Sequence, residues 1–546
     1  IFKPITSLIF DERGLLLPSA CSSSIRVLRQ LMKVFKKLRV ECPKSSIESK
    51  IDEFRTIEQE LPSPTLSWGG DDLLFDGIYP SLNDLDGIRS NTESQLADDD
   101  DQLREFGQVS KDLAGIQSVA DKLSRSFSIR EGDFKPKHGP GAVSEKFRDS
   151  KYEFPTWPER LDRFFPYLKW GCFNELNYTL DEAREDSPAK LIDVPKDYRG
   201  PRLIASEPIS SQFIQQGIMR SIRHSLRGTP LRFSYDPVSQ EPSRNLVLSS
   251  SADKSFSTID LSSASDRLSC FVVERIFRKN YRFLQQLNAA RTPSLLYPDG
   301  QVVQLKKFAA QGAAFTFPIQ SIVYAIICIG VIYSSNPTAR LVDLAKLVRV
   351  YGDDIIVPSV YFCRVKACLE ALYLKVNPAK SFSQGYFRES CGMDAYAGDD
   401  VSCVSILDLF QRRKPETLVS LVECSNNLYE KGFIRTARRL QETLPWKIRT
   451  RIPMVSLSSG MFGFSGNGET PLRTRWNQHW QQQECQVLVV ENKVLKTKPN
   501  GPNRLYQWFS EEPRPDVRWV AGEVIRVKAR YGLRWVPSYK LGCRKT

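Results

Sequence analysis

The stretch LVRVYGDDIIVPSV, residues 347–360, places two adjacent aspartates between two runs of apolar residues. Both runs are rich in β-branched residues, which is typical of strands, and Gly352 permits a tight turn between them. We therefore predict a β-hairpin with Asp353 and Asp354 at its tip. Two like charges held this close repel each other unless a cation neutralises them, so the pattern indicates a divalent metal. The alternative is a solvated turn, which is our interpretation of the two other GDD tripeptides in the chain.

A second source of carboxylates is the segment TIDLSSASD, residues 258–266. Asp260 would end a strand, and Asp266 follows past small residues that let a substrate approach closely. Either carboxylate alone is weak evidence, because Asp commonly caps helices. Together, a carboxylate at a strand end and two on a hairpin tip suit phosphoryl transfer assisted by two metal ions.

The other candidate ligands narrow the choice of metal. The 12 cysteines are scattered without a CxxC pair, and only three histidines are present, which argues against a zinc site. We interpret the cysteines as reduced thiols of a cytosolic protein. His138 lies in a Gly/Pro-rich loop without a nucleophile pattern around it, so we interpret it as structural rather than as an acid or base. An essential metal should therefore be a hard cation held by carboxylate oxygens.

The length of 546 residues predicts two to four domains or subdomains. The N-terminus lacks a signal-peptide layout. From composition and periodicity we predict four regions: helical at 1–134, with a solvated acidic loop at 71–101; mixed at 135–250; an α+β layer at 251–405; and mainly helical at 406–546.

Three smaller features of the α+β layer can be predicted. Residues 270–287 have apolar positions at helical spacing, and residues 295–305 have the pattern of a hairpin that turns at Asp299 and Gly300. The longest apolar run of the chain, residues 322–333, is too short to span a bilayer and predicts a core helix.

The net charge of +14 is unevenly distributed. Residues 411–546 contain 25 Lys and Arg against 11 Asp and Glu, so this segment carries the whole excess, together with six of the nine tryptophans. Basic charge attracts phosphates, and aromatic rings stack on unpaired bases, so the composition favours contact with nucleic acid. The alternative is a solvated basic face over a tryptophan-rich core.

Seven motifs, in order along the chain, resemble those of the catalytic β-subunit of replicases from single-stranded RNA bacteriophages. They are HGPGAVSE (138–145), VPKDYRGPRLIASEP (194–208), DLSSASD (260–266), QGAAFTFPIQS (311–321), YGDD (351–354), NPAKSF (377–382) and FRESCG (387–392). The resemblance covers roughly residues 135–405. It implies an RNA-directed RNA polymerase with a right-hand α+β fold. Residues 135–250 would form the fingers, 251–405 a palm of antiparallel sheet packed on helices, and 406–546 a mainly helical thumb.

The resemblance also assigns roles to individual residues. Asp260 and Asp353 would ligate two magnesium ions, for which manganese could substitute, with Asp354 in support. The triphosphate of the incoming nucleotide would be held by Lys196, Arg199 and Arg202, because ammonium and guanidinium groups suit phosphate oxygens. The other assignments are Asp266 and Ser321 near the ribose, Gly312 in a loop close to the template, and Lys380 as a proton donor to pyrophosphate.

The partners that the resemblance implies are an RNA template and product, nucleoside triphosphates, the host elongation factors Tu and Ts, and a ribosomal small-subunit protein. The protein would replicate a phage genome in the cytoplasm of the infected bacterium, without a membrane. Three alternatives stay open at this point. A reverse transcriptase or DNA polymerase would share the carboxylates, a non-catalytic RNA-binding protein would explain the basic C-terminal quarter, and a metal-dependent nuclease would explain the metal site.

Overall fold

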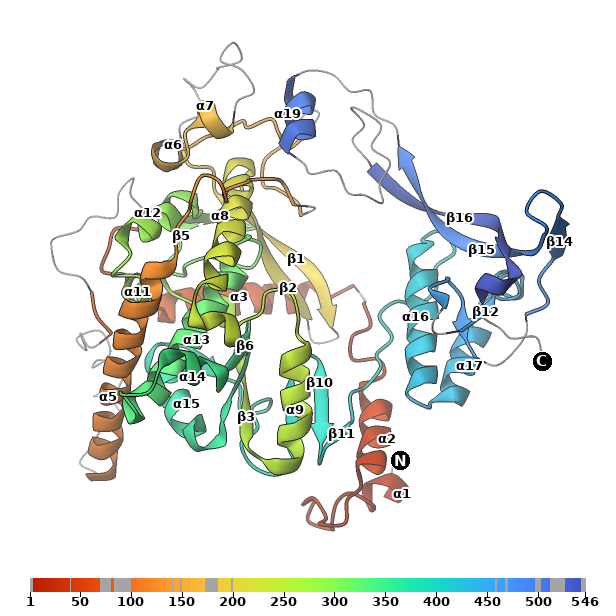
Figure 1. Ribbon diagram of the computed structural model, residues 1–546, viewed down its shortest axis with the longest axis horizontal. Coiled ribbons are helices and arrows are strands. Elements are labelled where there is room, and N and C mark those ends of the chain that lie inside the picture. Colours follow the sequence, from red (N-terminus) through yellow and green to blue (C-terminus); the bar gives the residue numbers. More distant parts are fainter. Residues whose placement is uncertain are drawn as a thin grey trace.

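The structure is a computed structural model. It describes residues 3–39, 41–68, 80–82, 100–139, 141–147, 150–171, 185–197, 200–456, 459–466, 470–495, 502–510 and 526–541. Arg199 and most of the predicted acidic loop at 71–101 lie outside the described residues. A large body of mixed helices and strands holds most of the chain, and a smaller C-terminal body lies beside it (Figure 1).

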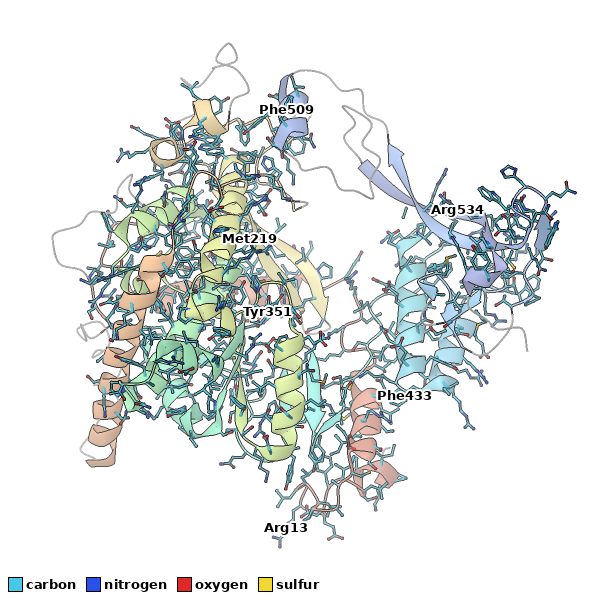
Figure 2. All side chains as sticks on the ribbon, viewed as in Figure 1. Arg13, Met219, Tyr351, Phe433, Phe509 and Arg534 are labelled. Carbon is cyan, nitrogen blue, oxygen red and sulfur yellow. The ribbon has the colours of Figure 1, made fainter. Side chains whose placement is uncertain are left out.

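The opening stretch folds as the predicted hairpin in the middle of the larger body, where Tyr351 is labelled in Figure 2. Strands β6 (Arg349–Tyr351) and β7 (Asp354–Pro358) pair antiparallel, and Gly352 begins the two-residue turn between them with φ of 67°. A glycine is favoured at such a position because a side chain strains the left-handed backbone.

The hairpin belongs to a four-stranded sheet in which every pair is antiparallel. Its order is β6-β7-β3-β8, where β3 is Phe256–Ser262 and β8 is Lys375–Val376. The register sets Asp260 of β3 opposite Asp354 of β7, so carboxylates that are far apart in sequence become neighbours. The predicted α+β class is confirmed, and an antiparallel sheet packed on helices is the layout predicted for the palm.

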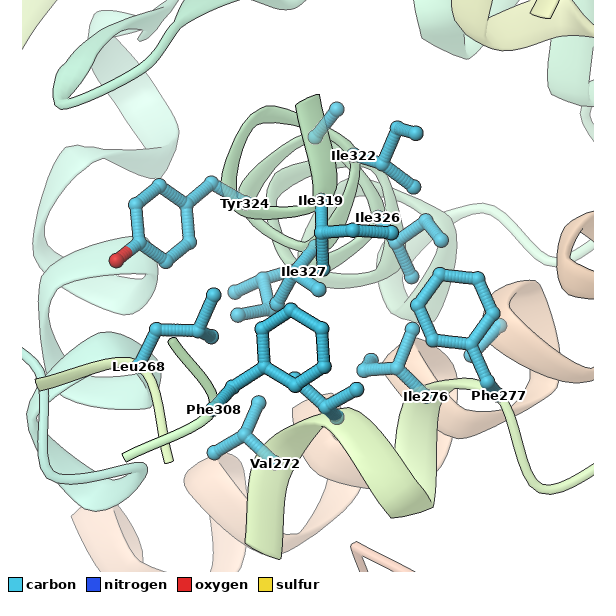
Figure 3. Close-up of a cluster of buried hydrophobic side chains, with 14 of the residues drawn as sticks. Leu268, Val272, Ile276, Phe277, Phe308, Ile319, Ile322, Tyr324, Ile326 and Ile327 are labelled. Atoms are coloured by element: carbon cyan, nitrogen blue, oxygen red, sulfur yellow. The ribbon is translucent and has the colours of Figure 1, made fainter. Parts of the chain in front are cut away.

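Helix α13 (Thr316–Ser335) forms the centre of the core. Its isoleucines pack against Leu268, Val272 and Phe308 (Figure 3). By length and composition the helix could cross a membrane, but 89% of its most apolar window is buried inside the protein. The predicted core helix is therefore confirmed.

Two helices pack closely against α13. They are α5 (Asp100–Leu123) and α15 (Phe362–Ala371). The backbones of α5 and α13 approach so closely that a Cβ at Gly330 would lie 2.3 Å from the Cα of Ile116. A partly buried ion pair joins all three helices, because Arg364 of α15 donates to Asp112 of α5 and to the hydroxyl of Ser334 on α13.

A second sheet faces the first across the site described below. Its order is β2-β1-β4-β5, formed by β1 (Ala189–Asp197), β2 (Gly200–Ser206), β4 (Ser294–Leu296) and β5 (Val302–Gln304). The predicted hairpin at 295–305 is confirmed as β4 and β5. Helix α3 (Lys44–Glu60) packs against this sheet through Phe54.

The predicted helix over residues 270–287 is two helices in the structure. Helix α11 (Cys270–Ile276) ends before Phe277, and α12 (Tyr281–Ala290) begins after Asn280, whose side chain accepts a hydrogen bond from the amide of Phe283. Such a cap satisfies a free amide at the start of a helix and so favours a new helix here.

Other elements of the larger body are α1 (Lys3–Thr6), α2 (Ser22–Lys33), α6 (Glu159–Phe164), α7 (Tyr167–Trp170), α8 (Ile209–Arg227), α9 (Glu241–Asp253), α10 (Ala264–Arg267), α14 (Leu341–Lys346), β9 (Phe387–Ser390), β10 (Met393–Tyr396) and β11 (Asp399–Asp400).

The C-terminal region is less helical than predicted. It starts with α16 (Glu416–Glu430), α17 (Ile434–Glu442) and α18 (Trp446–Arg449), followed by the short strands β12 (Met454–Val455) and β13 (Phe464–Ser465). It continues as a sheet of β14 (Thr474–Asn477), β15 (Gln482–Leu495) and β16 (Arg526–Pro537). The expectation that helices dominate therefore fails beyond α18.

Strand β15 was not predicted from the sequence, because both faces of this strand are apolar. Val487 joins one hydrophobic cluster and Leu488 joins another, so the strand lacks the alternation of polar and apolar residues that marks a half-buried strand.

Helix α19 (Pro502–Ser510) returns from the C-terminal region to the larger body, where it lies near α6 and α7 (Figure 1). The ring of Tyr506 packs edge-on against Tyr152, with the ring centroids 5.5 Å apart. Its hydroxyl donates a hydrogen bond to the carbonyl of Trp170. The C-terminal quarter thus contacts the predicted fingers as well as forming a body of its own.

Candidate active site

A cavity of about 690 Å³ opens between the two sheets. It is lined by strand ends and loops of both sheets and by one face of α3. Seven of the ten residues selected from the sequence line this cavity: Lys196, Arg202, Asp260, Asp266, Gly312, Asp353 and Lys380. Segments spread over nearly 200 residues of sequence therefore meet at one place.

Asp260 is held firmly at the end of β3. Its amide donates to the hydroxyl of Ser381 at 3.1 Å, and its carboxylate accepts from the side-chain amide of Asn377 at 3.0 Å. The Nζ of Lys380 lies 3.3 Å from the same carboxylate. Burial raises the pKa of Asp260, Lys380 opposes that rise, and the charge of Asp353 adds to it. A cation beside these two carboxylates would favour their ionised forms.

The two aspartates of the hairpin have different surroundings. Asp353 is exposed at the tip and lines the cavity. Asp354 is largely buried beside Ser390 and Cys391, and burial, followed by the charge of Asp353, raises its pKa to about 6. Asp354 does not line the cavity, so its placement fits a supporting role behind the other two carboxylates.

The donor set of Asp260 and Asp353 fits a hard divalent cation. Both supply carboxylate oxygens, which Mg²⁺ prefers, and both open onto a cavity large enough for a phosphorylated ligand. In the described ranges, three or more His, Cys, Asp or Glu side chains do not come together as a metal-binding group. The remaining ligands of an ion would therefore come from substrate and water, as is usual for Mg²⁺ at phosphate-binding sites.

The opposite wall of the cavity carries two cationic side chains on β1 and β2, beside the carboxylate of Asp197. Lys196 on β1 and Arg202 on β2 both line it. Partial burial of its ammonium group, followed by repulsion from Arg202, lowers the pKa of Lys196. An anion bound between the two cations would relieve that repulsion, which is the property that a triphosphate site requires.

Lys380 keeps its proton at neutral pH. Burial works against its charge, but the charge of Asp260 and the hydrogen bond to it, together with the charges of Glu389 and Asp353, outweigh burial and raise the pKa of Lys380. The residue is therefore a proton-carrying group within reach of the cavity, as a proton donor must be.

Two residues selected from the motif QGAAFTFPIQS, residues 311–321, have structural contacts. Gly312 has φ of 129°, and a Cβ there would lie 1.9 Å from the carbonyl oxygen of Ala205, so only glycine lets this loop lie against β2. Ser321 is fully buried, outside the lining of the cavity. Its hydroxyl donates to the carbonyl of Phe317 at 2.8 Å and accepts from the amide of Gly352 at 2.9 Å, which fixes the hairpin tip.

His138 lies away from the cavity in an aromatic cluster with Tyr152, Phe154 and Phe213. Burial lowers its pKa to about 3, with the charge of Lys151 as the next cause, so the ring is neutral at physiological pH. A neutral ring packed among aromatic side chains agrees with its interpretation as a structural histidine.

Several residues that line the cavity were not selected from the sequence. Lys50, Glu53, Phe54 and Ile57 come from α3, which carries no recognisable motif and precedes the carboxylates by some 200 residues. Asn377 lies inside the NPAKSF segment, where its position next to a strand could have suggested a contact with Asp260.

Comparisons with known proteins bear on the same part of the chain. Residues 171–437 match the family model described as RNA replicase, beta-chain. The RNA-directed RNA polymerase subunit beta of Escherichia virus Qbeta is 31% identical over 241 residues, which are 44% of this chain and 38% of the relative. The RNA-directed RNA polymerase beta chain of Escherichia phage MS2 is 32% identical over 247 residues, which are 45% of this chain and 41% of the relative. The match therefore spans less than half the length of these relatives.

One solved structure is similar at a lower level. It is the insertion-loop deletion mutant of the RNA-dependent RNA polymerase of a human picobirnavirus, with a TM-score of 0.38 and 12% identity. The alignment covers 77% of this chain and 79% of that chain.

Proposed function

From the match of residues 171–437 to the family model described as RNA replicase, beta-chain, we propose that this protein synthesises RNA on an RNA template by nucleotidyl transfer. The reaction joins the 3′-hydroxyl of a growing strand to the α-phosphate of a nucleoside triphosphate and releases pyrophosphate. Base pairing selects the nucleotide, and the protein binds the backbone and holds the reacting groups.

One observation carries the proposal. Asp260 on β3 and Asp353 in the turn between β6 and β7 belong to one sheet, and both open onto a cavity whose opposite wall presents Lys196 and Arg202. Carboxylates on one side suit metal cations, and cations on the other suit phosphates, so the cavity has the charge pattern that a metal-bound triphosphate needs.

The cofactors in this proposal are two Mg²⁺ ions, for which Mn²⁺ could substitute. Asp260 and Asp353 would hold them, with Asp354 in support behind the hairpin. When bound, such ions neutralise the charge that develops on the attacking and leaving oxygens.

The other residues of the cavity bind, orient or move protons. Lys196, Arg199 and Arg202 would orient the triphosphate, and Lys380 would give its proton to the departing pyrophosphate. Asp266 would accept a hydrogen bond from the ribose, while Ser321 would act through the hairpin tip that it holds. Gly312 would keep its loop close to the template.

The proposal extends to the whole chain. Residues 1–134 would support the fingers at 135–250, residues 251–405 would form the palm, and residues 406–546 the thumb. The protein would replicate a single-stranded RNA phage genome in the cytoplasm of the infected bacterium, in a complex with host elongation factors Tu and Ts and a ribosomal small-subunit protein.

The test is Asp353→Asn in the full chain, assayed for Mg²⁺-dependent incorporation of labelled nucleotides on an RNA template. We expect incorporation to fall by at least about a thousandfold, because the amide is a poor ligand for a hard cation, while RNA affinity stays within about twofold. The matched control is Asp399→Asn, in the GDD tripeptide at 398–400, which lies outside the cavity lining and should keep parental activity.

Three outcomes would overturn the proposal. Retained incorporation in Asp353→Asn would separate synthesis from these carboxylates. Absence of incorporation in the parent, with tight RNA binding, would favour a binding protein. A parent that incorporates deoxynucleotides at least as well as ribonucleotides would favour a reverse transcriptase or DNA polymerase.

A further inference from the structure

A buried lysine lies next to the candidate ribose-binding carboxylate. Lys307 has no exposed surface, and its Nζ lies 3.5 Å from the Oδ1 of Asp266 and 3.4 Å from the Oε2 of Glu58. The same ammonium lies 3.3 Å from the ring centroid of Phe54. Burying a charged group is costly unless it is paired, so these contacts offset the cost of burying the Lys307 side chain.

The backbone around Lys307 is fixed. Arg291 donates to the carbonyl of Lys307 at 3.0 Å and to that of Phe308 at 2.7 Å. The amide of Phe308 donates to the carbonyl of Leu268, which follows α10 directly, at 2.7 Å. The ammonium of Lys307 therefore has a set position relative to the helix that carries Asp266.

Asp266 itself sits on an element with little stability of its own. Helix α10 is four residues long, and the residue before it, Ser263, has φ of 51°. An isolated turn of helix is unstable in water. Besides Lys307, the side chains of Tyr324 and Glu60 contact α10. Tyr324 donates a hydrogen bond to the carbonyl of Ala264 at 2.9 Å, which fixes the start of the helix but not the side chain of Asp266. The ion pair between Arg267 and Glu60 contributes little, because the Glu60 side chain is half exposed.

We infer that Lys307 is a positioning residue that holds the carboxylate of Asp266 on the cavity wall, where it accepts a hydrogen bond from the 2′-hydroxyl of the incoming nucleotide. The inference rests on the proposed function and adds to it a residue outside all seven motifs. An ionised carboxylate can only accept hydrogen bonds, so a fixed Asp266 prefers a ribose hydroxyl to the hydrogen of deoxyribose. Through Glu58, helix α3 takes part in the same network.

The experiment uses the full chain with the double substitution Lys307→Met and Glu58→Gln. It removes the cation and the partner that would otherwise be left buried with an unpaired charge, and methionine still fills the space beside Phe54. The measurement is kcat/KM for ATP and for dATP on a poly(U) template. We expect the ratio of ATP to dATP to fall about tenfold or more, mainly through a higher KM for ATP, with kcat/KM for dATP within about twofold of the parent.

The matched control is Lys306→Met. Lys306 is the neighbouring residue and also contacts α3, since its Nζ donates to the carbonyl of Leu61 at 3.0 Å, but it has no contact with Asp266. It should keep the parental ratio, which separates the positioning of Asp266 from the docking of α3. Asp266→Asn should lower the ratio as the double substitution does, and adding Asp266→Asn to the double variant should give no further loss.

An unchanged ratio in a folded double variant with parental kcat for ATP would overturn the inference while leaving the proposed function intact. If the double variant unfolds, the single substitution Glu58→Gln tests the inference instead. It leaves Asp266 as the carboxylate that pairs with Lys307, so the ratio of ATP to dATP should be kept. A lower ratio in Glu58→Gln would overturn the inference. A parent without templated incorporation would instead overturn the proposed function.

Discussion

Asp354 combines a carboxylate with a largely buried position, and this makes the stability of the protein depend on pH. Its pKa is raised to about 6, chiefly by burial and next by Asp353, so the native state binds this proton more tightly than the unfolded chain. Its ionisation therefore destabilises the fold as pH rises from about 4 through 6.

We expect Asp354→Asn to stabilise the metal-free protein, because the amide keeps the shape of the side chain without its charge. The gain should be small at pH 4 and reach about 3 kcal/mol at pH 8, since one pKa unit corresponds to about 1.4 kcal/mol. Denaturant unfolding of parent and variant at both pH values, with a chelator present, measures it. If the substitution raised the free energy of unfolding equally at pH 4 and pH 8, ionisation of the buried Asp354 could not be the cause.

At the scale of residues, the sequence predicted what depends on local chemistry. Asp260 and Asp353 could be selected because β-branched flanks and small neighbours mark a strand end and a hairpin tip. Lys307 could not, because its contacts with Glu58 and Asp266 exist only after α3 packs against the predicted palm. The same holds for Ser321, whose hydroxyl faces the hairpin backbone rather than the cavity.

At the scale of elements, the close contact of α5 and α13 depends on two glycines. A Cβ at Gly115 would lie 2.7 Å from the carbonyl oxygen of Gly330, and one at Gly330 would lie 2.3 Å from the Cα of Ile116. Both obstacles are backbone atoms, so the helices would have to separate. We expect Gly115→Ala on α5 to destabilise the protein by about 1–3 kcal/mol through overpacking, as measured by denaturant unfolding.

The control for this prediction is Gly107→Ala on the same helix α5. A Cβ there meets no atom within 4 Å, so the substitution should stabilise the protein by about 0.5–1 kcal/mol through helix propensity. If both variants lost stability, the close contact between α5 and α13 would not be the reason that α5 tolerates alanine poorly.

Elements were predictable where short apolar runs flank a glycine turn, as in the two hairpins, or where a helix is long and apolar, as in α13. Strand β15 has buried residues on both faces, with Val487 and Leu488 in different clusters, and the sequence between β14 and β15 contains no glycine or proline that would mark a turn. The break between α11 and α12 depends on the side chain of Asn280, a local cap inside a pattern that reads as one helix.

At the scale of the whole molecule, the excess positive charge coincides with exposed aromatic rings in the C-terminal body. Trp476 and Trp480 are 60% and 68% exposed, next to the ribbon of β15 and β16 on which Arg534 is labelled in Figure 2. We expect Trp476→Ala and Trp480→Ala to weaken binding of single-stranded RNA by about 1–3 kcal/mol each through lost stacking.

Fluorescence anisotropy with a labelled single-stranded RNA, repeated over a range of salt concentrations, tests this expectation. For the parent, the logarithm of the association constant should fall linearly with the logarithm of the salt concentration. The tryptophan variants should keep the same slope, because they leave the phosphate contacts intact. Val238→Ala, at a residue 85% exposed in the larger body, is the control for removing an exposed apolar side chain. Unchanged affinity in both tryptophan variants would assign these rings another role.

Helix α19 connects the C-terminal region to the larger body through side-chain contacts. It belongs to the C-terminal region by sequence, but Tyr506 packs against Tyr152 and Phe213 and donates to the carbonyl of Trp170. Truncating a packed aromatic ring costs about 3–5 kcal/mol, so we expect Tyr506→Ala to release α19, with faster hydrogen exchange of its amides. Tyr506→Phe keeps the ring and should retain most of the protection. If exchange in α19 is the same in Tyr506→Ala as in the parent, contacts other than this ring hold the helix, and the C-terminal region is joined to the predicted fingers by another route.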